Sequence, residues 1–474
     1  MLFNSFPFFV LVVITFIFYY LPIGFFRKRN TQVFVLILSS LVFYGYFKPY
    51  LLFLLFFSGA VNVTASYLVR YGPQKRRLFY SSLGVIINLL VLAFFKYSRL
   101  IAVSFFDTSS SVANFLLTIP LPIGISFFTF EGISLVVDVY RSQTNDRFKN
   151  LVPTSFATHF RNSFFFIAFF PHLVSGPILK AHDFIPQIDK KMFKDIDWNN
   201  SFRMLVVGFF MKLVVADNLN DYTSLLYYPR FLASSSMDII FMLLGYSFQI
   251  FADFAGYSLI ALGIASLFGY RLMQNFNFPY ISTSFSEFWR RWHISLSTFL
   301  KEYLYFPLGG NRKGKIRTYI NLFITMVLGG LWHGAAWSYA VWGAFHGIML
   351  ALERLINDRF NFNLRQKTLL WHLKALFIFS CVTLAWLLFK LPQFDQAIMF
   401  VKACFENLSI VNNYVLIFVI SLYSLPVIFY HLLYLKRQSE PLFLKKYEFV
   451  IYGLMIFLIV TNSGTPGTFI YFQF

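Results

Sequence analysis

Residues 321–350 read NLFITMVLGGLWHGAAWSYAVWGAFHGIML and lie inside an apolar stretch that runs over 319–352. A helix needs about 20 apolar residues to cross a hydrocarbon core of ~30 Å, so this stretch is long enough for two crossings. In its middle stands "GGLWHGAAW" (329–337), which sets a histidine among glycines and alanines. We therefore expect two membrane helices here, with His333 at membrane depth.

The composition of the whole chain is that of an integral membrane protein. Of its 474 residues, 58% are hydrophobic and 13% are charged, whereas soluble domains carry about 25% charged residues. The net charge of +20 comes from short basic clusters between apolar runs. Because that pattern sets membrane orientation, we expect no nucleic-acid partner. Cys381 and Cys404 show no metal-ligand spacing, so we expect neither a disulfide nor a metal.

Apolar stretches of spanning length recur along the chain. They run over 6–26, 31–47, 51–69, 79–95, 117–138, 152–173, 202–219, 236–269, 319–352, 370–390, 412–434 and 447–461. Because 236–269 and 319–352 are long enough for two crossings each, we expect roughly eleven to fourteen spans, some broken or re-entrant. The chain is thus predicted to be an all-α polytopic membrane protein, with one transmembrane domain over 1–461 and a hinge and aromatic tail over 462–474.

Basic clusters predict the orientation of these spans. "RKR" (27–29) and "KRR" (75–77) are separated by two spans, so both clusters can lie in the cytoplasm. Four more lysines and arginines within 436–446 mark another cytoplasmic loop, and 447–461 then carries the chain out. Both termini are therefore expected on the extracytoplasmic side of the membrane.

The segment 284–317 differs from a membrane span. Ser284 and Glu287 form the S-x-x-E pattern of a capped helix start. The apolar side chains that follow share one helical stripe: Phe285, Phe288, Trp289, Trp292, Leu296, Phe299 and Tyr303. We expect an amphipathic helix over 284–303 that lies in the membrane interface or dips into it. The glycines and basic residues of "LGGNRKGKIR" (308–317) are then expected to form a cytoplasmic turn.

His333 is the leading candidate for chemistry. A histidine at membrane depth is costly unless it lines a cavity or pairs with another group. Its small neighbours allow two backbones to approach closely, or they leave room for a ligand. Trp332 and Trp337 can wall that space. The alternative is a helix-packing patch that contains a hydrogen-bonded histidine.

Other polar residues in or near apolar stretches are also candidates. Asp253, in "FADFAGYS", indicates either a substrate pathway or a carboxylate that pairs with an arginine for assembly. Taken alone, His293 is an interfacial histidine with a polar tip, and His172 is equally open to both interpretations. His346 follows His333 by 13 residues, and we do not expect it on the same local surface.

Five blocks of the chain together resemble a known family. They are "LPIGISFFTFEGISLVVDVYR" (121–141), "FFPHLVSGPI" (169–178), "FQIFADFAGYSLIALGIASLFGYRLMQNFNFPY" (248–280), "FSEFWRRWHISLSTFLKEYLYFPLGGNR" (285–312) and "GGLWHGAAWSYAVWGAFHG" (329–347). In this order they resemble the membrane-bound O-acyltransferases (MBOAT family), and within them the bacterial branch that O-acetylates alginate or peptidoglycan. The chain departs from the alginate members with Glu131 and His172, where glutamine is usual, and with Ala255, where serine is common.

The resemblance implies an MBOAT-type ring of about eleven or more transmembrane and re-entrant helices around a central tunnel, in the bacterial cytoplasmic (inner) membrane. It implies that His333 is the catalytic histidine and His293 the second family histidine. We expect Asp253, Trp332 and Trp337 to support the tunnel. The implied donor substrate is cytoplasmic acetyl-CoA, without a cofactor, and the implied partner is an extracytoplasmic SGNH-hydrolase-like O-acetyltransferase that delivers the acetyl group to the polysaccharide.

A mechanism follows from these assignments. One neutral imidazole can take the proton of an attacking hydroxyl and return it to the thiolate that leaves a thioester, so we expect His333 to act as general base. The donor is cytoplasmic and the polysaccharide lies outside, so a relay is needed. The aromatic end "FIYFQF" (469–474) follows a flexible "SGTPG" (463–467). It can fold back into the outer mouth of the tunnel and present Tyr471 to His333.

A phenol suits such a relay. Its pKa of ~10 lies near the ~8.5 of a thiol, so an aryl ester retains much of the transfer potential of a thioester. We therefore expect Tyr471 to be an acyl carrier, and the alternative for the tail is an aromatic anchor in the membrane interface. Two other functions stay open. One is transfer of D-alanyl or another acyl group by the same fold, and the other is transport of lipid-linked sugars, which the lack of a visible internal repeat disfavours.

Overall fold

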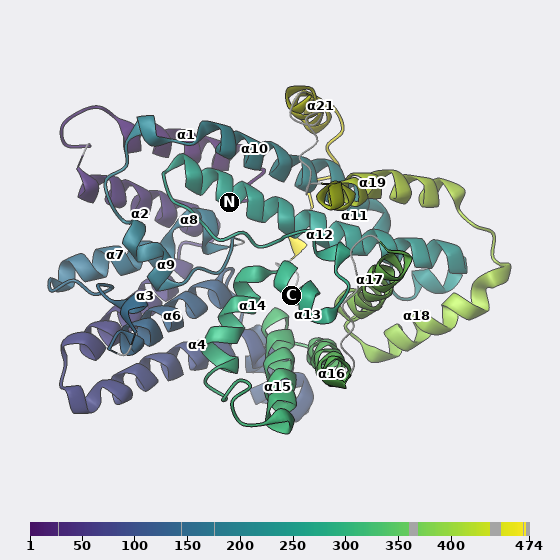
Figure 1. Ribbon diagram of the computed structural model, residues 1–474, viewed down its shortest axis with the longest axis horizontal. Coiled ribbons are helices and arrows are strands. Elements are labelled where there is room, and N and C mark those ends of the chain that lie inside the picture. The colour runs from purple at the N-terminus through teal and green to yellow at the C-terminus, as the bar shows by residue number, and fades with distance from the viewer. Residues whose placement is uncertain are drawn as a thin grey trace. The chain divides into compact units, whose positions relative to one another are not determined.

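The computed structural model describes residues 1–26, 28–143, 145–174, 176–359, 368–436, 447–467 and 469–470, and the regular elements in these ranges are all helices (Figure 1). The chain divides into two compact units. Unit 1 comprises Met1–Leu205 and Ile260–Met273, and unit 2 comprises Val206–Leu259 and Gln274–Phe474. The helical architecture confirms the predicted all-α class.

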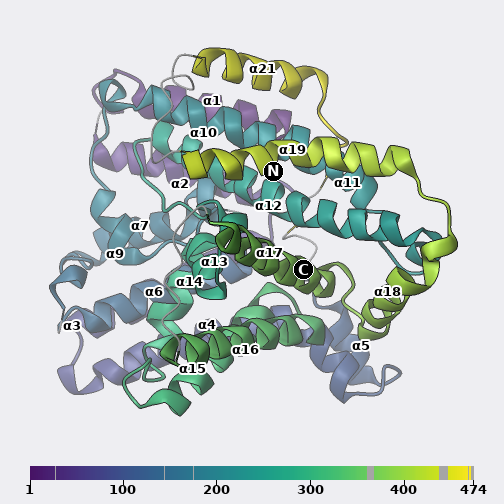
Figure 2. The same cartoon turned by 45° about the vertical axis from the view of Figure 1, so that its right-hand side comes forward.

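Unit 1 contains the N-terminal helices. They are α1 (Phe6–Tyr20), α2 (Arg29–Gly45), α3 (Leu51–Tyr71), α4 (Arg77–Phe105), α5 (Ser111–Thr118), α6 (Ile125–Arg141), α7 (Phe156–Ala168), α8 (Phe170–Leu173), α9 (Ala181–Phe184) and the first part of α10 (Trp198–Phe209), with 3₁₀ turns at Gln74–Arg76, Asp146–Phe148, Ile185–Gln187 and Phe193–Asp195. Helices α3, α4 and α6 pack against one another (Figures 1 and 2).

Buried polar contacts fix the packing of these three helices. Asn62 of α3 and Asn88 of α4 exchange hydrogen bonds through their side-chain amides, with donor–acceptor distances of 2.7 and 3.2 Å. A Cβ on Gly132 of α6 would lie 2.1 Å from Asn62 Nδ2, so α6 reaches this pair because it carries a glycine there. Satisfied polar pairs of this kind hold helices together where apolar side chains face lipid instead of water.

Unit 2 contains the remaining helices. They are α11 (Asp217–Thr223), most of α12 (Ser236–Leu267), α13 (Phe285–Arg291), α14 (Ile294–Leu300), α15 (Lys315–His333), α16 (Trp337–Arg359), α17 (Leu369–Lys390), α18 (Phe394–Glu406), α19 (Tyr414–Lys436) and α21 (Glu448–Thr461), with π-helical segments η5 (Phe210–Ala216) and η8 (Lys301–Tyr305) and 3₁₀ turns at Arg230–Ala233, Pro279–Ile281 and Asn407–Ser409.

Helices α15 and α16 form a close antiparallel pair (Figure 2). A Cβ on Gly330 would lie 2.1 Å from Tyr339 O, and a Cβ on Gly343 would lie 2.2 Å from Met326 O. Both positions therefore require glycine. The predicted division of 319–352 into two helices is confirmed, and these two glycines serve backbone approach instead of leaving room for a ligand.

Five of the described helices are long and apolar enough to cross a membrane. They are α3, α4 with the turn before it, α12, α17 and α19. Helix α12 is a single helix of 32 residues, although its stretch of sequence also allowed two crossings. Large apolar side chains point outward, such as Phe53 and Phe449, which are 80% and 75% exposed. Such surfaces suit a hydrocarbon environment and confirm a multi-pass membrane protein.

The amphipathic helix expected over 284–303 is interrupted. Helix α13 ends at Arg291 and α14 begins at Ile294, because His293 between them adopts a left-handed backbone with φ of 42°. Asn275 stabilises the break, since its backbone carbonyl accepts a hydrogen bond from Ile294 N at 2.9 Å. Hydrogen bonds to residues outside the two helices thus accompany the interruption of the helical pattern at this histidine.

The start of α13 agrees with the expected cap. Ser284 Oγ accepts a hydrogen bond from Glu287 N at 3.0 Å. Much of the apolar stripe is covered by the rest of unit 2, and Phe288 and Trp292 are buried. The location of this element in the membrane interface remains a prediction.

Candidate active site

His333 lies at the break between two helices. It is the last residue of α15, and Gly334 after it has an extended backbone. A Cβ on Gly334 would lie 2.2 Å from the ring of Tyr339, so this turn depends on glycine. His333 is 3% exposed. The break therefore holds an imidazole inside unit 2, at the end of a helix and not along its face.

The two histidines singled out from the sequence are close together. The ring centres of His293 and His333 lie 6.2 Å apart, and His293 is buried as well. Trp332 packs beside both, with its ring centre 5.3 Å from that of His333 and 6.0 Å from that of His293. The positive φ of His293 and the break after His333 bring together two residues that lie 40 positions apart in the chain.

Other aromatic residues complete the surroundings of His333. Trp337, expected to wall the site, is 50% exposed at the start of α16. Trp342 is buried instead, with its ring centre 5.3 Å from that of His333, and Phe389 of α17 lies at the same distance. We did not single out Trp342 and Phe389 from the sequence, because only the packing of α16 and α17 against α15 brings them to the histidine.

His346 is nearer to the site than its sequence spacing indicated. Its ring centre lies 4.7 Å from that of Trp342, which in turn contacts His333. The imidazole is fully buried, and the Phe288 ring stacks on it with centres 6.1 Å apart. One tryptophan therefore separates His346 from the leading histidine.

Asp253 of α12 is part of a buried group of charges. Its Oδ1 lies 2.8 Å from Lys212 Nζ, and Asp217 Oδ1 lies 2.6 Å from the same nitrogen. Asp253 thus pairs with a lysine, where the sequence suggested a pathway or an arginine. We did not single out Lys212 and Asp217 in advance, and the only signal for Lys212 is a lysine inside an apolar stretch, "FFMKLVV" (209–215).

The C-terminal segment lies against this group and leads toward the histidines. Ile470 N donates a hydrogen bond to Asp253 Oδ2 at 2.7 Å. The Phe469 ring is buried, with its centre 5.8 Å from that of Phe254, whose own ring is 4.6 Å from that of His293. Tyr471, the expected acyl carrier, lies outside the described residues. The ring of Phe254 therefore lies between Phe469 of the tail and His293.

Unit 1 holds a set of buried polar side chains on α6, which we call the α6 seam: the two acids Glu131 and Asp138, and Ser134. Each contacts the irregular segment 172–182. His182 Nδ1 lies 2.6 Å from Asp138 Oδ2, and Ala181 N donates to Ser134 Oγ at 3.1 Å. The seam supplies hydrogen-bond partners for the buried backbone where the chain leads into α9, as buried backbone requires.

His172 belongs to this seam. Its Nδ1 lies 2.8 Å from Glu131 Oε1, and both side chains are fully buried. Glu131 and His172 are two of the three departures from the family pattern noted in the sequence. Their contact gives His172 a structural partner.

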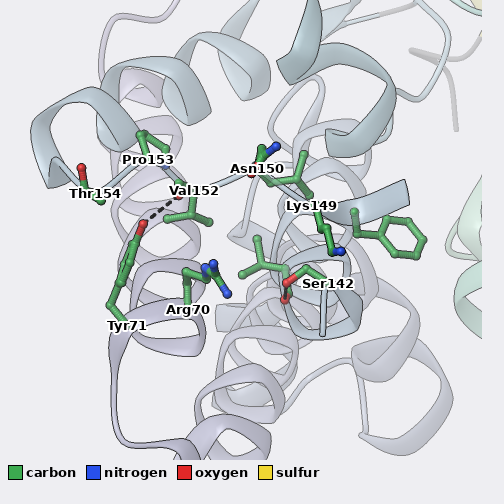
Figure 3. Close-up of a pocket in the computed structure, with 11 residues that line it drawn as sticks. Arg70, Tyr71, Ser142, Lys149, Asn150, Val152, Pro153 and Thr154 are labelled. Atoms are coloured by element: carbon green, nitrogen blue, oxygen red, sulfur yellow. Dashed lines mark hydrogen bonds between the residues drawn. The ribbon is translucent and has the colours of Figure 1, made fainter. Parts of the chain in front are cut away.

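A hollow on unit 1 is separate from these groups (Figure 3). It has a volume of about 360 Å³, and Arg70, Ser142, Lys149 and Asn150 contribute to its lining. Tyr71 donates a hydrogen bond from its hydroxyl to Val152 O at 3.0 Å along one side, as Figure 3 shows. None of the residues singled out from the sequence lines it.

Within the described part of the chain, no group of three or more His, Cys, Asp or Glu side chains is arranged to hold a metal ion. The rings of Trp332, Trp342 and Phe389 surround His333.

Comparison with known proteins connects this geometry to a family. A sequence profile of MBOAT, the membrane-bound O-acyltransferase family, matches residues 141–391. The chain belongs to the membrane-bound O-acyltransferase family. His293 and His333 both lie within the matched residues, whereas the C-terminal segment lies beyond them.

Curated relatives agree with this assignment. The chain is 39% identical over 391 residues to the probable alginate O-acetylase AlgI of Pseudomonas aeruginosa, which covers 80% of this chain and 70% of that protein. It is 34% identical over 424 residues to a peptidoglycan O-acetyltransferase of Helicobacter pylori, which covers 82% and 78%. A teichoic acid D-alanyltransferase of Bacillus subtilis is 29% identical over 238 residues, or 48% of this chain and 58% of that protein. The chain is therefore an O-acyltransferase.

Proposed function

We propose that this enzyme transfers an acetyl group from cytoplasmic acetyl-CoA, across the bacterial inner membrane, to an extracytoplasmic SGNH-hydrolase-like partner that O-acetylates a cell-surface polysaccharide. The observation that supports it most is the buried His293–His333 pair beside the docked end of the chain. The relatives that act on alginate and peptidoglycan favour acetyl as the group and a polysaccharide as the acceptor.

In this proposal His333 is the general base. It takes the phenolic proton of Tyr471 as the phenol oxygen attacks the carbonyl carbon of the acetyl thioester. The carbon–sulfur bond then breaks, and the imidazolium returns the proton to the CoA thiolate, so that the products are an aryl acetate and free CoA. His293 and Trp332 pack beside His333 and keep water from the thioester.

Delivery completes the cycle. The partner's hydroxyl nucleophile attacks the acetyl-Tyr471 ester, which regenerates the phenol and leaves the acetyl group on the partner. Phe469 packs near Phe254, which in turn packs against His293. Tyr471 follows Phe469 by two residues, and consecutive Cα atoms are only about 3.8 Å apart, which supports Tyr471 as the carrier. The basic clusters of the sequence predict an extracytoplasmic position for this end of the chain, the side on which the proposed partner acts.

Mass spectrometry of the C-terminal peptide tests the proposal. Purified enzyme is incubated with isotope-labelled acetyl-CoA and cleaved after Lys446, which releases residues 447–474. We expect label on this peptide, loss of label in Tyr471→Phe and retention in Tyr452→Phe, which changes a second phenol of the same peptide. His333→Ala should slow labelling by about 10²–10⁴-fold, whereas the exposed His372→Ala should not.

The opposite result would favour a mechanism in which the tail carries no acetyl group. An unlabelled peptide, together with CoA release that occurs only when an external acceptor is added, would mean direct transfer and would leave the tail as an anchor. D-Alanyl transfer is the second candidate, because a D-alanyltransferase is among the relatives. Labelling by a D-alanyl carrier protein, and none by acetyl-CoA, would establish it.

A further inference from the structure

The buried charges of unit 2 do more than neutralise one another. Lys212, Asp217 and Asp253 are each at most 4% exposed in their side chains, and a single ammonium faces two carboxylates. Burying charges costs free energy unless each charge also makes hydrogen bonds. Among the described residues, main-chain atoms of Gly467 and Ile470 supply such hydrogen bonds.

The contacts to the tail use every member of the group. Lys212 Nζ donates to Gly467 O at 3.2 Å, and Gly467 N donates to Asp217 Oδ1 at 3.4 Å. Ile470 N donates to Asp253 Oδ2 at 2.7 Å. These hydrogen bonds are all made to backbone atoms of the tail. The charged side chains therefore recognise the path and register of the tail backbone and not the identity of its side chains.

Local backbone features build the group. Lys212 lies in the π-helical segment η5, a distortion that is frequent at functional sites. A Cβ on Gly256 of α12 would lie 2.8 Å from Gly208 O and 2.9 Å from Lys212 N. This glycine lets η5 approach α12 closely enough for Lys212 to reach Asp253.

Upstream contacts fix where the segment begins. Asn218 Nδ2 donates to Asn462 O at 2.9 Å, and Gly464 N donates to Leu213 O at 2.9 Å. A Cβ on Gly464 would lie 2.4 Å from Asn218 N. Glycine is therefore required at the point where the tail crosses the start of α11, and part of the expected hinge is bound in this structure.

We propose that Lys212, Asp217 and Asp253 form a clamp for the main chain of the tail at Gly467 and Ile470 and thereby set how far the end of the tail reaches toward His293 and His333. This inference rests on the proposed function, in which the tail carries the acetyl group. The three are positioning residues, because they contact the tail backbone and none of the reacting atoms. The clamp holds the tail in the register in which the Phe469 ring packs against the Tyr257 ring, with ring centres 4.3 Å apart.

Docking can be measured without catalysis. Ile470 is 3% exposed, so in a chain with Cys381 and Cys404 replaced by serine, the thiol of Ile470→Cys should react slowly with a small maleimide. Lys212→Met removes the cation and its hydrogen bond to Gly467, and Lys212→Arg should restore part of both. Loss of a hydrogen bond to a charged group corresponds to about a tenfold or greater rise in the maleimide rate.

A matched pair of glycine variants tests the clamp independently, in case Lys212→Met does not fold. Gly464→Ala forces the tail off Asn218, whereas a Cβ on Gly453 in α21 meets nothing within 4 Å. We expect Gly464→Ala to raise the maleimide rate and to lower acetyl labelling of the tail, at the same melting temperature as the parent. Gly453→Ala should change neither rate nor labelling.

The outcomes separate the clamp from the relay. Maleimide rates that stay at the parent value in both Lys212→Met and Gly464→Ala would overturn the clamp, even if Tyr471 is labelled in all chains. Rates that rise as expected, in a chain whose Tyr471 never takes label, would support the clamp as a docking site and overturn the relay alone.

Discussion

Two regions of this protein use buried carboxylates to hold an irregular piece of chain, and they do so differently. The α6 seam of unit 1 holds residues 172–182, which continue into structure at both ends. The clamp of unit 2 holds the tail at Gly467 and Ile470, near the end of the chain. Histidines pair with the seam, whereas a lysine shared by two acids forms the clamp.

We expect this difference to separate a contact that serves stability from a contact that serves transfer. A segment fixed at both ends adds its hydrogen bonds to the folded state, so breaking the seam should unfold unit 1. A chain end can leave its site while the rest stays folded. We therefore expect changes in the seam to alter the free energy of unfolding, and changes at the tail to alter transfer.

The largest expected effect on stability is that of Asp138→Ala in the seam. It leaves His182 and the nearby backbone without their buried acceptor, and breaking a buried pair costs about 3–5 kcal/mol. Thermal unfolding in detergent should show a large fall in melting temperature. The control is Asp146→Ala, which removes an exposed pair with Lys149 and should change it little. Equal melting of both variants would contradict the stabilising role of the seam.

The second largest expected effect is the interaction free energy between Glu131 and His172, measured by unfolding. A double-mutant cycle through Glu131→Gln, His172→Gln and the double variant should give an interaction energy within about 0.5–3 kcal/mol. Each single variant leaves half of a buried pair, so the double variant should be less destabilised than the sum of the two. Simple additivity of the unfolding free energies would show that the two departures from the family pattern are independent.

The smallest effect on stability should come from Asp253→Asn in the clamp. The Lys212–Asp217 pair remains, and the amide oxygen can still accept from Ile470 N, so we expect a change below about 1 kcal/mol. The same thermal assay measures it. A loss as large as that of Asp138→Ala would erase the distinction between the clamp and the seam.

Much of the fold was accessible from patterns within single segments. Apolar length predicted the helices, and the stretch 319–352 divided into two as expected. The interruption of the helix at His293 was not predicted, because the apolar stripe across 284–303 continues through it. Hydrogen bonds to Asn275 and Asn277, which lie outside that stretch, accompany the left-handed turn. Trp337 was expected at the site and is half exposed, whereas Trp342 takes that place.

The sequence by itself determined that this is an all-α membrane protein, which residues are polar at membrane depth, and through the resemblance its family. Hydropathy and motif order are properties of the linear chain, so they need no tertiary information. Only the tertiary structure decided that Lys212, Asp217 and Asp253 meet, that Glu131 pairs with His172, and that the tail backbone docks beside the histidines. These contacts join residues far apart in sequence, and what fixes them is helix packing through glycines such as Gly256, which leaves no periodic signal.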